Sequence, residues 1–173
     1  MRAIPLTVAV LAAALALTSC DDGGGGDKAK GKDNSACEIG RVSVQIGSAS
    51  VAPAAGDTGE VPVSITNQSA PCTLDDFPGV ELRGTGGSAK VPVLDGATSQ
   101  KLELAKGDSA SFTVSYVRGK DGDAASMAAT SVVVSLPGAD GTESFPWKYG
   151  PVAGRGDATK PDASVSAFQQ AGD

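Results

Sequence analysis

Hydrophobic and polar residues alternate with a period of two in several stretches of this chain. Residues 41–46 read Arg-Val-Ser-Val-Gln-Ile and residues 60–66 read Glu-Val-Pro-Val-Ser-Ile-Thr, so every second side chain is apolar or nearly so. A β-strand places successive side chains on opposite faces, and this period is therefore typical of strands with one buried face. Pro62 has no N–H, which favours an edge strand or a nitrogen that faces away from a neighbouring strand.

The same pattern continues toward the carboxyl end. Six further alternating or short apolar segments are expected to form strands, at residues 80–83, 89–94, 101–105, 109–117, 130–136 and 144–149. Turns rich in Gly, Asp and Pro separate them, and residues 124–129 are expected to form a short helical turn. Seven or eight short strands predict an all-β fold, an antiparallel immunoglobulin-like β-sandwich over residues 37–153.

The composition agrees with a β core and excludes one class of partner. The chain has 173 residues, of which 40% are hydrophobic but only 4% aromatic, and it has no His. Its core must therefore rest on Val, Leu, Ile and Ala, and β-branched Val favours strands. The formal net charge is -6 and no run of Lys or Arg occurs. No nucleic-acid partner is expected, because such a partner requires a basic face.

The amino-terminal segment has the pattern of an export signal. Arg2 precedes a mostly apolar run at residues 4–17, which is shorter than the roughly 20 residues of a membrane-spanning helix. The run ends in Leu-Thr-Ser-Cys, which resembles the lipobox of bacterial lipoproteins. That resemblance implies that residues 1–19 are a signal peptide and that Cys20 carries a diacylglycerol lipid on the outer face of the cytoplasmic membrane. An ordinary secretory signal followed by a chance Cys is the alternative.

Two polar segments flank the predicted sandwich. Residues 20–36 contain the lipidated Cys20, four consecutive Gly and alternating Lys, and we expect a flexible tether with a root-mean-square reach of about 20 Å. Residues 154–173 offer little besides Val165 and Phe168 for packing, so this tail is expected to be disordered.

The three cysteines divide between the lipid and a disulfide. If Cys20 is lipidated, Cys37 and Cys72 remain as an even pair in an oxidising compartment, and they are expected to form a disulfide bond. A metal site built on these two thiols is not expected, since the chain has no His and no further Cys.

Four short motifs resemble one known family. They are Cys37 before a strand, Pro-Cys-Thr-Leu at 71–74, Phe-Pro-Gly-Val at 77–80 and Lys-Gly-Asp-Ser-Ala at 106–110. Together they look like the actinobacterial domain of unknown function 4232, over roughly residues 37–152. The resemblance implies an exported, often lipid-anchored protein with a conserved fold. It implies no particular activity.

The candidate chemistry is sparse and does not predict an enzyme. The absence of His removes the usual general base, and pairing of the two sandwich cysteines removes a thiol nucleophile. Asp121 and Asp123 lie in Lys-Asp-Gly-Asp, which is similar to part of a calcium loop but lacks the later ligands. We expect these two to be solvated turn residues. No metal and no cofactor other than the lipid is expected.

Four residues remain as candidates for a binding surface: Asp75, Asp76, Trp147 and Tyr149. Trp147 could be an exposed contact for a glycan or a protein, but a core so poor in aromatic residues favours a buried position for it. The expected function is a membrane-anchored, non-catalytic binding domain outside the cytoplasm, with a cell-wall polymer, an envelope protein or a small molecule as ligand. The alternative is a structural or accessory subunit of a cell-envelope complex.

Overall fold

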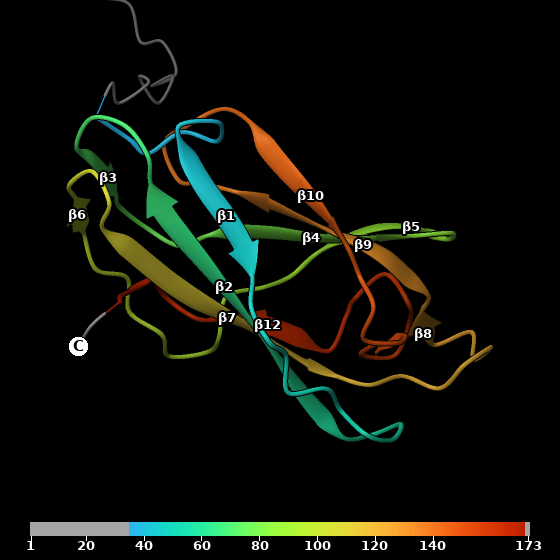
Figure 1. Cartoon of the computed structure of the whole chain (residues 1–173). Coiled ribbons are helices and arrows are strands. Elements are labelled where there is room, and N and C mark those ends of the chain that lie inside the picture. Colours follow the sequence, from blue (N-terminus) through green and yellow to red (C-terminus); the bar gives the residue numbers. More distant parts are fainter. Residues whose placement is uncertain (1–34, 172–173) are drawn as a thin grey trace, which may run out of the picture.

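The computed structural model describes residues 35–171, so the signal-peptide region, Cys20 and most of the tether lie outside the described residues. The described chain is built from strands and turns, with 13 strands in antiparallel sheets (Figure 1). No described residue belongs to a helix that could cross a membrane. The strands are β1 (Val42–Ile46), β2 (Thr58–Asn67), β3 (Cys72–Leu74), β4 (Gly79–Gly84), β5 (Gly87–Lys90), β6 (Leu102–Leu104), β7 (Ser109–Val117), β8 (Ser126–Met127), β9 (Ala129–Ser135), β10 (Thr142–Pro146), β11 (Val152–Ala153), β12 (Ala163–Val165) and β13 (Gln169–Gln170).

Two larger sheets form a β-sandwich, which confirms the fold predicted from the sequence. One sheet has the order β1-β2-β7-β12, with β13 also on β7, and the other has the order β10-β9-β4-β5. Two short pairs, β3-β6 and β8-β11, close the ends. Each of the eight expected segments overlaps a strand. The helical turn expected at residues 124–129 is wrong, because the backbone of β8 there pairs with β11.

The longest ladder of the fold joins β2 to β7. Nine consecutive residue pairs connect them, from Thr58↔Val117 to Thr66↔Ser109. The alternation read from the sequence places one side chain in two from each strand inside the sandwich. The buried inward residues include Val61, Val63, Ile65, Ala110, Phe112, Val114 and Tyr116.

Pro62 lies in a central strand, so of the two alternatives expected for it the edge strand is wrong and the nitrogen that faces away from a neighbouring strand is confirmed. β2 runs between β1 and β7. The N–H of Gly47 donates to the carbonyl of Pro62 at 2.8 Å, and in an antiparallel pair the nitrogen of a residue points the same way as its carbonyl. The Pro62 nitrogen therefore faces away from β7 and toward Gly47, one residue past the end of β1. The N–H that Pro62 lacks would lie just beyond the last residue pair of β1 and β2, Ile46↔Val63, so its absence leaves that pairing intact.

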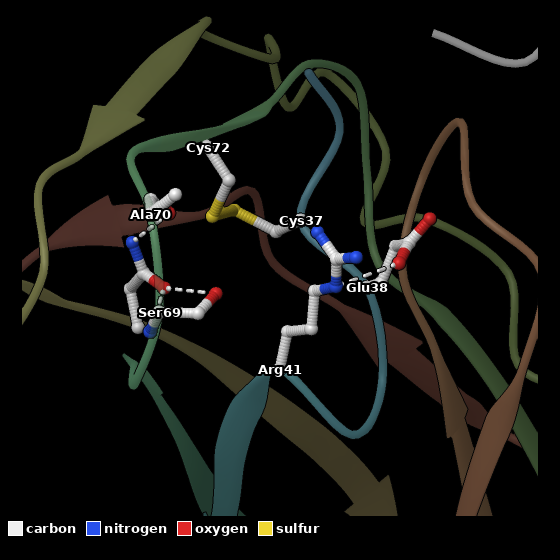
Figure 2. A network of polar contacts seen from close by, with 7 residues as sticks. Cys37, Glu38, Arg41, Ser69, Ala70 and Cys72 are labelled. Carbon is white, nitrogen blue, oxygen red and sulfur yellow. Dashed lines mark hydrogen bonds and ion pairs between the residues drawn. A yellow bond between two sulfur atoms is a disulfide. The ribbon is translucent and has the colours of Figure 1, made fainter. Parts of the chain in front are cut away.

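The disulfide between Cys37 and Cys72 is present and holds the start of the domain, with Cα atoms 4.9 Å apart (Figure 2). Cys37 is completely buried. Its N–H donates to the carbonyl of Thr73 at 2.9 Å, and the N–H of Thr73 donates to the carbonyl of Ser35 at 2.8 Å. The last two residues of the expected tether, Ser35 and Ala36, are thus fixed beside β3.

Asn67 supports the same end of the domain and is the one fully buried polar side chain among residues 35–171. Its Nδ2 donates to the carbonyls of Ala70 and Leu104, both at 2.9 Å, and its Oδ1 accepts from the N–H of Ser69 at 3.0 Å. These bonds hold the loop that leads to Cys72 against β6, and Figure 2 shows Ser69 and Ala70 beside the disulfide.

The carboxyl-terminal segment is part of the sandwich, so the disorder expected for residues 154–173 is wrong for residues 154–171. β12 and β13 both pair with the outer edge of β7. Phe168 is 1% exposed, and its ring contacts that of Phe112 edge-on at 5.6 Å between centroids. Composition alone does not predict this order, because the segment is held by backbone pairing with β7 and by the packing of Phe168 against Phe112.

Replacement of both disulfide cysteines by Ser is expected to lower the free energy of unfolding by about 3 to 4 kcal/mol, because the bond closes a long loop in the unfolded chain. Urea denaturation of oxidised protein measures the difference. Wild-type protein reduced before unfolding should match the variant, and an unchanged midpoint after reduction would contradict the prediction.

Phe168→Ala is expected to lower the free energy of unfolding by about 3 to 5 kcal/mol, since it removes a buried ring from the core. Gln170→Ala, in exposed β13, serves as the matched control and should change it by less than about 0.5 kcal/mol. Thermal denaturation of the two variants tests this. Equal stability of the two would show that the tail is dispensable.

Candidate functional site

The β2–β7 ladder separates two ends of the molecule with different roles. At one end, Asn67 and Ser109 lie near the disulfide and near Ser35, where the described chain begins. At the other end are Thr58 and Val117. Nine pairs of an antiparallel ladder span about 27 Å. We call the first the entry end and the second the far end.

Four loop segments meet at the far end and leave a hollow between them. They are the β4–β5 hairpin turn, residues 119–130, residues 147–151 and the turn at 154–160. The larger hollow has a volume of about 550 Å³, and a smaller one of about 240 Å³ adjoins it. Both are lined by Thr85, Ser126 and Ala128, so together they form one open depression.

Close backbone contacts hold these loops together. A Cβ on Gly84 would collide with the carbonyl oxygen of Ala128, and one on Gly154 would collide with that of Ala125. The N–H of Gly154 donates to the Ala125 carbonyl at 2.9 Å, and the N–H of Gly119 donates to the Pro151 carbonyl at 2.8 Å. Glycine at these positions lets the main chains touch, which gives the hollow a fixed shape.

A cluster of three aromatic rings lies behind the hollow. Trp147 is 6% exposed, and its ring contacts Tyr116 and Tyr149 edge-on at 5.1 and 4.9 Å between centroids. Its Nε1 donates to the carbonyl of Gly150 at 2.7 Å. Burial, and secondly the neighbouring Tyr116, raise the pKa of Tyr149. The preferred expectation for Trp147, a core residue, is confirmed, although its small exposed part lines the hollow.

The remaining sequence candidates lie elsewhere. Asp75 and Asp76 are exposed in the loop between β3 and β4, at the entry end. Asp76 has a φ of 99° and its Oδ1 accepts a hydrogen bond from the N–H of Phe77 at 2.9 Å. This local bond stabilises an otherwise unfavourable backbone conformation. The structure therefore does not bring these carboxylates together with Trp147 and Tyr149.

Four charged residues line the hollow, and of these only Asp121 and Asp123 were considered from the sequence, as solvated turn residues. Lys120, Asp121 and Asp123 come from the loop after β7, and Lys148 comes from the segment after β10. Asp123 also accepts a hydrogen bond from the N–H of Ala125 at 3.0 Å through Oδ1. Within residues 35–171, no group of three or more His, Cys, Asp or Glu side chains is placed to hold a metal ion. No sequence motif connected Lys148 with the Lys-Asp-Gly-Asp stretch at residues 120–123, because only folding brings these two loops together.

The turn at 154–160 is closed by its own bonds. Arg155 pairs with Asp162, with 2.9 Å between Nε and Oδ1. Hydrogen bonds from Thr159 lower the pKa of Asp157, and Lys160 lowers it further. Residues 155–157 read Arg-Gly-Asp, and both charged side chains of this tripeptide are therefore bound to residues of the same turn or to Asp162 just after it.

These features define a disulfide-linked antiparallel β-sandwich with a preformed hollow at one end. The chain belongs to the family described as Domain of unknown function (DUF4232), whose model matches residues 37–169. Neither a curated protein nor a solved structure matches the chain. The matched range begins at the disulfide cysteine Cys37 and reaches β13, so it includes the carboxyl-terminal strands.

Gly154→Ala is expected to lower the free energy of unfolding by about 1 to 3 kcal/mol, because the added Cβ forces the Ala125 backbone apart from the 154–160 turn. Gly86→Ala adds a Cβ where no atom lies within 4 Å and is the control. Urea denaturation compares the two. The prediction fails if both glycines tolerate Ala equally.

Proposed function

We propose that this protein is an exported lipoprotein that presents a non-catalytic binding domain outside the cytoplasmic membrane. The lipobox-like residues 17–20 and the Gly-rich segment after them support the anchor. A disulfide persists in oxidising compartments, which agrees with export. Binding is favoured over catalysis because the chain has no His and both sandwich cysteines are in the disulfide.

The position of the hollow carries the proposal of a binding role. A chain anchored through Cys20 enters the domain at Ser35, beside the disulfide. The hollow lies at the opposite end of the nine-pair ladder, about 27 Å further along. With the tether on the membrane side, the hollow opens into the space beyond the membrane surface. Polymers and proteins of the envelope can reach it there.

Cys20→Ser is expected to release the protein from the membrane fraction or to block its processing, because it removes the proposed site of lipid attachment. Fractionation followed by immunoblotting measures the distribution. A Ser19→Ala variant keeps a small residue before the cysteine and should stay membrane-bound. Full membrane retention of the Cys20→Ser protein would refute the anchor.

The released Cys20→Ser protein also tests binding. Retention on purified cell wall supports direct binding of a wall polymer. Stoichiometric cross-linking to one envelope protein, with no retention on the wall, favours the accessory-subunit alternative instead.

A further inference from the structure

Opposite charges line the hollow without neutralising one another. Lys120 and Lys148 contribute ammonium groups, and Asp121 and Asp123 contribute carboxylates. None of the four belongs to an ion pair within residues 35–171, where the pairs include Arg83 with Glu81 and Arg155 with Asp162. Each group is therefore open to an external partner of opposite sign. A ligand that carries both an anionic and a cationic group satisfies both kinds of side chain.

The apolar lining of the hollow sets the size of the apolar groups that fit. It consists of Ala128, Ala129 and Pro151, whose side chains are small, and of Trp147, of which only 6% is exposed. A volume of about 550 Å³ lies within the usual range for small-molecule sites, roughly 300 to 1,000 Å³. Groups of methyl size can rest against this lining while charged groups reach the two lysines and two aspartates, which are all exposed.

Two other classes of envelope ligand fit less well. A sugar ring stacks on an exposed aromatic face, yet Trp147, the aromatic residue that lines the hollow, is only 6% exposed and is packed against Tyr116 and Tyr149. A phosphate polymer would meet the carboxylates of Asp121 and Asp123 in a chain whose formal net charge is already -6. The mixed charge of the hollow disfavours a polyanion, and its buried aromatic rings disfavour a glycan.

We propose that the hollow binds a zwitterionic peptide group, with a carboxylate against Lys120 and Lys148, an ammonium group against Asp121 and Asp123, and alanine-sized side chains against the apolar lining. The inference rests on the proposed binding function and names its ligand class. Such a group occurs in the peptide part of a wall polymer and in free peptides, and both sources share this chemistry.

The test uses the full chain with Cys20→Ser, titrated with the synthetic peptide Ala-Lys-Ala in its free form and in acetylated and amidated forms. The double variant Lys120→Glu/Lys148→Glu should bind the free peptide at least tenfold more weakly, a change of about 1.4 kcal/mol. Lys101→Glu/Lys106→Glu changes the net charge equally but flanks β6 at the entry end, and should bind within twofold of the parent. Calorimetry measures all three.

The carboxylates have a separate readout. In the parent, acetylation of the amines should weaken binding, whereas Asp121→Asn/Asp123→Asn should bind free and acetylated peptides alike. Equal losses in the two lysine double variants, or no loss in either, would overturn the inference.

Intact cell wall and cell wall stripped of its peptides distinguish the two possible sources of the peptide. Retention on intact wall, lost after an amidase has stripped its peptides, identifies the polymer, whereas binding of free peptide without retention identifies a soluble peptide. Retention that is undiminished in the Lys120→Glu/Lys148→Glu variant leaves the binding function standing and refutes the site. Absence of binding in every arm, with no cross-linked protein partner, refutes both.

Discussion

The nine-pair ladder between β2 and β7 is the constraint on which the rest of the structure depends. It carries the alternating Val, Ile and Phe side chains that fill one half of the core. It also offers a further edge of β7 to the carboxyl-terminal strands. Because a ladder of this length resists local opening, its two ends keep a fixed separation. The disulfide and the hollow are therefore held apart by the same pairing.

The two ends are stabilised by different kinds of interaction. At the entry end, a disulfide and the buried amide of Asn67 fix a segment that has few apolar side chains of its own. At the far end, main chains touch at glycines, and Tyr116 links loops through its hydroxyl, which donates to the carbonyl of Tyr149 at 3.1 Å. Gly59 lies opposite Tyr116, and a Cβ there would come within 2.5 Å of the ring. A covalent bond thus stabilises the entry end, and close backbone packing shapes the far end.

Strand positions followed well from periodicity wherever a strand buries one face, as in β2 and β7. Short strands such as β8 and β11 carry two residues each and have no period to detect. Phe168 was misjudged because its burial depends on Phe112, which is distant in the chain. Local composition cannot report a partner of that kind, since the free energy of packing comes from non-local contacts.

The sequence by itself predicted the β class from periodicity, the pairing of Cys37 with Cys72 once Cys20 was assigned to the lipid, and a core position for Trp147 from the scarcity of aromatic residues. Only the tertiary structure decided where the hollow forms and which residues line it. Lys120 and Lys148 come from loops that neither pattern nor motif connects, and antiparallel pairing carries both to the far end. Asp75 and Asp76, which the sequence made candidates, lie at the other end because β3 pairs with β6. A site formed by converging loops is defined by chain topology, which no local pattern encodes.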